Sequence, residues 1–300
     1  PIEKIPQKLR ELVSEIEYHK PPNSIQQVYA LAKTLGSIFP SIRMGLEMAL
    51  LDLMQQSMRQ WFKSPFIQSK IQIQTNGLVW MGDEIFMRDQ IQKKVYLGFD
   101  CVKLKIGALD FKKELQLVEF LRKLSPKIII RLDANGAFRS QEALDKLNEL
   151  SEFNIHSIEQ PIQKGQWKIM SDLCKSSEIP IALDEELIGI EENVKKRALL
   201  DQIKPAYIIL KPSLLGGFME SDQWIKLAEE RNIGWWVTSA LESNLGLNAI
   251  SQFVGQYPNL SYQGLGTGSL YKNNFASRAS LTDLKMTYSK TDFDELPFDN

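Results

Sequence analysis

The sequence predicts an α/β fold of the (β/α)8 barrel type. From about residue 68, short β-branched or apolar runs alternate with amphipathic stretches. The polar residues that end the middle runs recur at intervals of 25 to 28 positions: Lys105, Asp133, Glu159, Asp184, Lys211 and Ser239. This interval is typical of a βαβ unit, whose strands are parallel. Eight runs fit a closed barrel, and no G-x-G-x-x-G turn follows the first run, which argues against an open dinucleotide-binding sheet.

The elements can be placed in order along the chain. The eight runs predict strands at Ile71–Thr75, Cys101–Lys105, Ile128–Asp133, Ile155–Glu159, Ile181–Asp184, Tyr207–Lys211, Trp235–Ser239 and Leu260–Gly264. Apolar residues spaced three and four apart predict intervening helices such as Phe111–Leu124, Gln141–Phe153 and Ser221–Arg231. We therefore expect a catalytic barrel domain over residues 68–270.

Residues 1–67 have a different pattern, which predicts a mostly helical cap. Ser24 followed by Gln27 forms a capping box, which predicts a helix ending near Leu35. Pro40-Ser41 opens a second helix, from Ile42 to about Gln60. Residues 271–300 are expected to form a tail that returns toward the cap, with one edge strand at Leu284–Tyr288.

Composition excludes several classes of protein. The 300 residues include 36 Lys and Arg against 37 Asp and Glu, so the net charge of −1 argues against nucleic-acid or membrane-surface binding. Two cysteines and two histidines exclude a disulfide framework and a four-cysteine zinc site. We expect a cytoplasmic enzyme with a small-molecule carboxylate substrate, and the sequence predicts no particular oligomeric state.

Charged residues end the predicted strands, where barrels bind their ligands. Asp133, Glu159 and Asp184 would point into one space from neighbouring strands, and three like charges at short range repel. A divalent cation would relieve that repulsion. Oxygen ligands suit Mg²⁺, or Mn²⁺ as a substitute, better than zinc.

Three lysines flank the predicted acids. Lys103 and Lys105 are two residues apart on one strand, so both side chains would enter the barrel mouth. We expect their mutual repulsion and burial to lower their pKa values, so that one can act as a general base. Lys211 would arrive from the opposite side. These groups predict abstraction of a proton alpha to a carboxylate, followed by stabilisation of the resulting enediolate.

The set of motifs resembles the enolase superfamily, in the muconate-lactonizing-enzyme-like subgroup that has lysines on the second and sixth barrel strands. The matching stretches, between about Pro40 and Tyr271, are Lys103-Leu104-Lys105, Arg131–Asn135, Ile158–Pro161, Ala182–Glu185, Leu210–Pro212 and Thr238–Ser243. The resemblance implies a modified (β/α)7β barrel and an N-terminal sheet with a mobile loop. Residues 1–67 supply only the helical part of that domain, so we expect an upstream segment in the whole protein.

Leu214–Phe218 and Gly264–Gly268 resemble the corresponding segments of the subgroup members that act in menaquinone biosynthesis. Those enzymes dehydrate 2-succinyl-6-hydroxy-2,4-cyclohexadiene-1-carboxylate to 2-succinylbenzoate. The resemblance implies that Lys105 is the base and that Lys211 stabilises the enediolate. The remaining roles that it implies are Mg²⁺ binding by Asp133, Glu159 and Asp184, support of metal and substrate by Arg131, Asn135 and Glu185, and binding of the succinyl end by Ser239, Gly264 and Gly266.

Two alternatives stay open at this point. One is N-succinylamino acid racemase or another lysine-base member of the subgroup, with both lysines acting as bases. Gly264 and Gly266 argue against a dipeptide epimerase, which needs an acid there for the substrate ammonium. The other alternative is a non-catalytic barrel module, which the retained lysines and acids oppose. His156 is expected to face the helices, and Cys101 to be a packed core residue.

Overall fold

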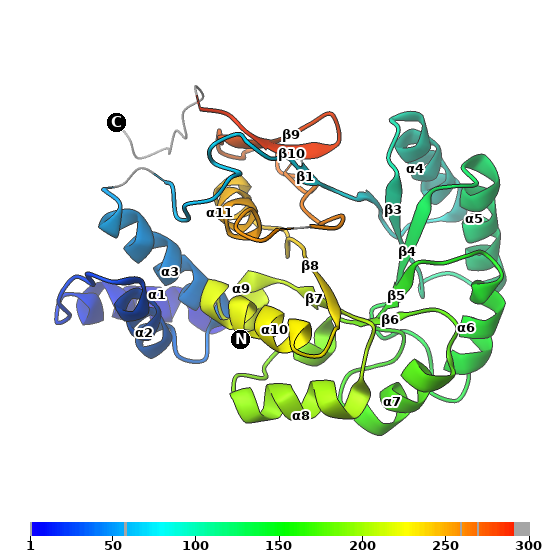
Figure 1. Ribbon diagram of the computed structural model, residues 1–300, viewed down its shortest axis with the longest axis horizontal. Helices are drawn as coiled ribbons and strands as arrows, with labels where there is room; N and C mark the ends of the chain where they lie inside the picture. Colours follow the sequence, from blue (N-terminus) through cyan, green and yellow to red (C-terminus); the bar gives the residue numbers. More distant parts are fainter. Residues whose placement is uncertain (1, 57–58, 259, 269, 291–300) are drawn as a thin grey trace.

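The computed structural model describes residues 2–56, 59–258, 260–268 and 270–290. Within these ranges, a curled sheet of seven parallel strands runs in the order β2-β3-β4-β5-β6-β7-β8 (Figure 1). The strands are β2 (Gly77–Val79), β3 (Cys101–Lys105), β4 (Ile129–Asp133), β5 (Ser157–Glu159), β6 (Ile181–Leu183), β7 (Tyr207–Leu210) and β8 (Gly234–Val237). Sequential parallel pairing confirms the predicted barrel class, because each strand returns beside the last through an outer helix.

The eighth barrel position is reduced to two bridging residues. Gln263 pairs in parallel with Thr75, and Gly264 pairs with Thr238, so this short segment joins the two ends of the sheet. The predicted strand Leu260–Gly264 is therefore correct in place but too long. Gly264 allows close packing, since an added Cβ would lie 2.2 Å from the Thr238 hydroxyl oxygen.

The prediction that Ile71–Thr75 is the first barrel strand is wrong. Its centre forms β1 (Ile73–Gln74), which belongs to a separate antiparallel sheet with the order β1-β10-β9. The other strands of that sheet are β9 (Ala279–Thr282) and β10 (Lys285–Tyr288). The first barrel strand is β2, which begins just after the predicted run, at Gly77. The predicted edge strand at Leu284–Tyr288 exists as β10, but it lies in the middle of its sheet.

Helices cover the outer face of the barrel sheet, as Figure 1 shows for α4 to α8. The helices that follow the barrel strands are α4 (Glu84–Tyr96), α5 (Phe111–Leu124), α6 (Ala143–Ser151), α7 (Trp167–Ser176), α8 (Asn193–Ile203), α9 (Pro212–Leu215), α10 (Phe218–Glu229) and α11 (Asn244–Val254). In α5, Leu117, Val118 and Leu121 are buried, which is the spacing of one helix face. The Asp110 carboxylate caps its first turn by accepting from Lys112 N.

Three helices form the cap: α1 (Ile5–Ile16), α2 (Ile25–Gly36) and α3 (Pro40–Met54). Ser24 Oγ accepts a hydrogen bond from Gln27 N, as the predicted capping box requires. The second predicted helix ends earlier than expected, at Met54, and Gln56 has a left-handed φ of 64°. Helix α3 packs against α9, which places the cap beside the sixth βα unit.

The limits of the three predicted regions, 1–67, 68–270 and 271–300, stay a prediction. Residues 291–300 of the predicted tail lie outside the described residues. Among the described helices, none combines the length and apolar character needed to cross a membrane.

Candidate active site at the carboxyl ends of the strands

The predicted charged residues lie at one end of the barrel sheet. Lys105, Asp133 and Glu159 are the last residues of β3, β4 and β5, and they are register partners across the three strands. Asp184 and Lys211 directly follow β6 and β7. The side chains of Asp133, Glu159 and Asp184 are almost fully buried. Parallel strands thus bring together groups that are up to 106 positions apart in sequence, from Lys105 to Lys211.

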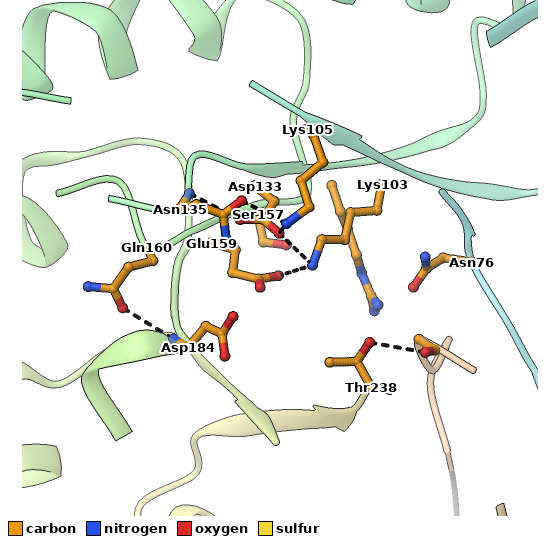
Figure 2. A network of polar contacts seen from close by, with 12 residues as sticks. Asn76, Lys103, Lys105, Asp133, Asn135, Ser157, Glu159, Gln160, Asp184 and Thr238 are labelled. Atoms are coloured by element: carbon orange, nitrogen blue, oxygen red, sulfur yellow. Dashed lines mark hydrogen bonds and ion pairs between the residues drawn. The ribbon is translucent and has the colours of Figure 1, made fainter. Parts of the chain in front are cut away.

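The lysines pair directly with the carboxylates, as Figure 2 shows for Lys103 and Lys105. Lys103 Nζ lies 2.8 Å from Asp133 Oδ2 and 2.6 Å from Glu159 Oε2, so it bridges two strand ends. Lys105 Nζ lies 2.7 Å from the same Asp133 oxygen. Lys211 forms an ion pair with Asp184 on the other side. The three cations therefore offset much of the repulsion among the acids.

The ion pairs raise the pKa of Lys103 and lower the pKa of Asp133. Burial by itself would lower the pKa of Lys103, but the charges of Asp133 and Glu159 outweigh it and raise that pKa. Burial opposes ionisation of Asp133, yet Lys103 and Lys105 hold its pKa below the ordinary value. The pKa of Glu159 is raised by burial and then by Asp133. The expectation of a lowered pKa is therefore wrong for Lys103, because the carboxylates dominate the lysine–lysine repulsion.

The oxygen atoms of this cluster suit a hard divalent cation. Among the described residues, no three Asp, Glu, His or Cys side chains form a compact metal-ligand group, since lysines separate the acids. Glu159 Oε1 and Glu185 Oε2 are nevertheless buried without a hydrogen-bond partner. Buried carboxylate oxygens left unpaired are costly, and they are the donors that Mg²⁺ prefers. The residues present fit the predicted cation.

A cavity of about 250 Å³ opens beside the charged cluster. Its lining divides into three kinds of group. Lys103, Lys105 and Lys211 supply positive charge, and apolar side chains such as Trp80 and Leu214 supply a second wall. The remaining wall includes three predicted residues, which are Ser239, Gly264 and Gly266. The cavity can accept an anionic molecule that also has an apolar part.

Asn135 and Glu185 lie beside the charged cluster. Asn135 Oδ1 accepts from Lys105 Nζ at 2.7 Å, and Asn135 Nδ2 donates to Glu185 Oε1 at 2.9 Å. The main-chain nitrogen of Asn135 also donates to Asp133 Oδ1. Asn135 has a φ of 44°, a conformation that asparagine tolerates better than most residues. These bonds fix the orientation of Lys105.

The predicted support of metal and substrate by Arg131 stays a prediction. Arg131 lies two residues before Asp133 on β4. Its guanidinium donates to Tyr262 O at 2.8 Å, and its Cζ lies 3.8 Å from the centroid of the Trp236 ring. Its guanidinium also donates to Ser261 Oγ at 3.2 Å, so its hydrogen bonds lie inside the barrel. His156, expected among the helices, instead stacks on Tyr207 with a centroid distance of 5.2 Å.

Two supports of the site were not predicted as site residues. Glu242 Oε2 accepts from Ser239 Oγ at 2.6 Å and from Ala240 N at 2.8 Å, so it orients the predicted Ser239. The sequence signal that could have indicated this support is the acidic residue three positions after Ser239. Gln160 Oε1 accepts from the main-chain nitrogen of Asp184; this residue lies in the family-matching stretch Ile158–Pro161, but no role was predicted for it.

Comparison with known proteins agrees with this geometry. A family model described as "Enolase C-terminal domain-like" matches residues 86–289. The o-succinylbenzoate synthase of Desulfotalea psychrophila is 53% identical over 81% of this chain. The N-succinylamino acid racemase of Thermus thermophilus is 28% identical over 75% of this chain. The crystal structure of MenC from D. psychrophila covers 96% of this chain and 86% of its own, with a TM-score of 0.86 and 44% identity.

The matches cover this chain more fully than they cover the relatives. The chain spans 66% of the length of the D. psychrophila synthase and 59% of the length of the T. thermophilus racemase. The family match, by contrast, includes every strand of the curled sheet except β2. On that match, the chain belongs to the enolase C-terminal domain-like family.

Proposed function

We propose that this chain carries o-succinylbenzoate synthase activity, as a lyase of menaquinone biosynthesis in the cytoplasm. The reaction is the syn dehydration of 2-succinyl-6-hydroxy-2,4-cyclohexadiene-1-carboxylate to 2-succinylbenzoate. The observation that carries the proposal is the 53% identity to a synthase of that name. The placement of Lys105 and Lys211 in one cavity, beside three buried carboxylates, supports it.

Asp133, Glu159 and Asp184 would hold Mg²⁺, and Mn²⁺ is a reasonable substitute. When bound, the cation supplies positive charge that stabilises anionic substrate oxygens. The unpaired Glu159 Oε1 supports this assignment. Asn135 and Glu185 would hold the surrounding hydrogen bonds in place, whereas the contacts of Arg131 give it a role inside the barrel.

Lys105 would remove the proton alpha to the substrate carboxylate, and the electron pair would move into an enediolate. Lys105 would then return that proton to the leaving hydroxyl on the same face, so that the C–O bond breaks and water departs. Lys211 would hold its positive charge against the ring from the other side. The apolar wall with Trp80 would contact the ring, and Ser239 with the Gly264–Gly266 main chain would bind the succinyl end.

N-succinylamino acid racemase activity is the second candidate, because Lys105 and Lys211 line the same cavity. Two bases on opposite faces of one carbon can invert its configuration. The cavity wall has glycine at 264 and 266, where an acid would be needed for a free ammonium group. An N-acylated amino acid has no such group, so this substrate class remains compatible with the lining.

The test is an absorbance assay of the cyclohexadiene substrate with Mg²⁺ and again with excess EDTA. Rapid aromatisation that EDTA abolishes is the expected result. An N-succinylamino acid incubated in D₂O tests the second candidate through exchange of the alpha proton. A folded protein that is stabilised by Mg²⁺ but converts neither substrate would contradict both catalytic proposals and favour a non-catalytic barrel.

A further inference from the structure

Gln160 connects all three strand ends that carry the acids. It directly follows Glu159 and is completely buried. Its main-chain nitrogen donates to Ala182 O on β6 at 2.9 Å, and its carbonyl accepts from Gly136 N beyond β4 at 2.7 Å. Its φ of 41° is unusual for a residue other than glycine. The surroundings hold the residue in a conformation that is costly on its own.

The side-chain amide of Gln160 has every hydrogen-bonding position filled. Its Oε1 accepts from Asp184 N at 3.2 Å and from Glu186 N at 3.3 Å. Its Nε2 donates to Ile162 O at 3.0 Å and to Glu186 Oε2 at 3.2 Å. Figure 2 shows the amide oxygen turned toward the Asp184 main chain. The Glu186 carboxylate is itself fixed, because Glu186 Oε1 accepts from Gly165 N at 2.8 Å.

Only an amide meets these demands. The site needs two acceptor positions facing N–H groups and two donor positions facing oxygens, in a place that water does not reach. A glutamate here would turn an oxygen toward both Ile162 O and the Glu186 carboxylate. A methionine of similar length would remove the partner of two N–H groups and of two oxygens, Ile162 O and Glu186 Oε2, at a desolvation cost.

The bond to Asp184 N bears on the geometry of the acids. Asp184 has φ −124° and ψ −80°, so its main chain follows neither the strand before it nor the 3₁₀ turn Glu185–Leu187 after it. The hydrogen bonds that Gln160 Oε1 accepts from Asp184 N and Glu186 N hold this turn. Through the peptide it shares with Glu159, the same residue therefore fixes two acids relative to each other.

We propose that Gln160, anchored by Glu186, is a positioning residue that sets the spacing of Glu159 and Asp184 for a divalent cation. This inference rests on the proposed function, in which those acids bind Mg²⁺. Gln160 is not one of the proposed metal ligands, and it does not line the cavity beside them. Residues that orient metal ligands in this way typically change metal affinity or activity by about 10- to 100-fold when they are replaced.

The experiment compares two glutamine-to-methionine variants by Mg²⁺ titration, followed through thermal stabilisation of the protein. Gln160→Met is expected to weaken Mg²⁺ binding, which raises the dissociation constant by about 10- to 100-fold. Gln252→Met is the matched control, because Gln252 in α11 is equally buried and bonds Asn248 and Phe62 rather than the acids. It should lower the melting temperature and leave Mg²⁺ affinity within twofold of the parent.

A charge-conserving exchange covers the case in which Gln160→Met fails to fold. Gln160→Glu places two carboxylates together, whereas Gln160→Glu with Glu186→Gln restores one amide facing one carboxylate. The double variant should regain at least part of the Mg²⁺ affinity and of kcat that the single variant loses. Equal Mg²⁺ affinity in the parent and all Gln160 variants would overturn the positioning role alone. A parent protein that ignores Mg²⁺ would overturn the proposed metal site as well.

Discussion

Glu47 in α3 makes protein stability depend on pH. Its side chain is fully buried, and its Oε2 accepts from Phe218 N at 2.5 Å, at the start of α10. Burial raises the pKa of Glu47 to about 8, against the opposing effects of the Phe218 and Met219 N–H groups and the charge of Arg43. The cap thus binds the barrel through a carboxyl group that holds its proton at neutral pH.

The sign of the effect follows from proton binding. The pKa of Glu47 is about 8 in the folded protein and 4.5 as the reference value, so the folded state binds the proton more tightly. The stabilisation is complete below about pH 4.5 and is lost as the pH rises through 8. The slope is about 1.4 kcal/mol per pH unit within that window, for a total of up to about 5 kcal/mol.

The perturbation is Glu47→Gln, which keeps an oxygen acceptor for Phe218 N and removes the titration. Urea unfolding of the parent and the variant at pH 5, 6.5 and 8 would give the free energy of unfolding at each pH. The difference between the two proteins should shift in favour of the variant as the pH rises. Comparison within each pH cancels the contribution of other titrating groups.

Glu119→Gln, at a half-exposed position on α5, is the control and should follow the parent at every pH. The reasoning would be refuted if the difference between parent and Glu47→Gln stayed constant from pH 5 to 8. That result would mean that Glu47 is ionised in the folded protein throughout, stabilised by Arg43 and the N–H groups more than burial destabilises it.

Three further substitutions test the site and its support. Lys105→Ala should reduce turnover by at least about 100-fold with an unchanged circular dichroism spectrum, and activity within tenfold of the parent would refute its role as base. Asp184→Asn should abolish the rise in melting temperature that Mg²⁺ causes; a full rise would exclude Asp184 as a ligand. Gly217→Ala should cost about 1–3 kcal/mol in urea unfolding, because its Cβ would lie 2.3 Å from Glu47 Oε2 at a φ of 104°; unchanged stability would contradict that packing.

Much of the candidate site could be predicted because it depends on strand order. The run Cys101–Lys105 matches β3 residue for residue, and Asp133 and Glu159 end their strands as expected. A parallel sheet places all such ends at one edge, so a charged residue after an apolar run already has a location. The first strand was misplaced because Ile71–Thr75 has the composition of a strand and does contain one, β1, whereas the barrel strand β2 begins at Gly77, next to the Phe99 ring.

Contacts between distant segments could not be predicted in the same way. From sequence, the Gly216-Gly217 pair indicates either a loop or a place that substrate or backbone approaches closely. In the structure, added Cβ atoms there would meet Arg43 and Glu47 from the cap. Phe218 and Glu47 are separated by 171 positions, and no local pattern connects them. The reversed direction of the Lys103 pKa has the same origin, because it depends on the distances to acids on other strands.

The supports of the site share one physical design. Glu114 Oε1 accepts three N–H groups, from Gly107 to Leu109, just after Lys105, at 2.6 to 3.0 Å. Gln160 braces the turn at Asp184, and Glu242 braces the chain after Ser239. Three loops, those after Lys105, Asp184 and Ser239, are therefore each held by a buried or half-buried polar side chain. Such loops need little rearrangement when charge develops on a substrate, which is the condition for strong electrostatic stabilisation. Replacing one of these supporting side chains should alter affinity and rate while the lysines and acids of the charged cluster all stay present. This result would separate positioning from chemistry.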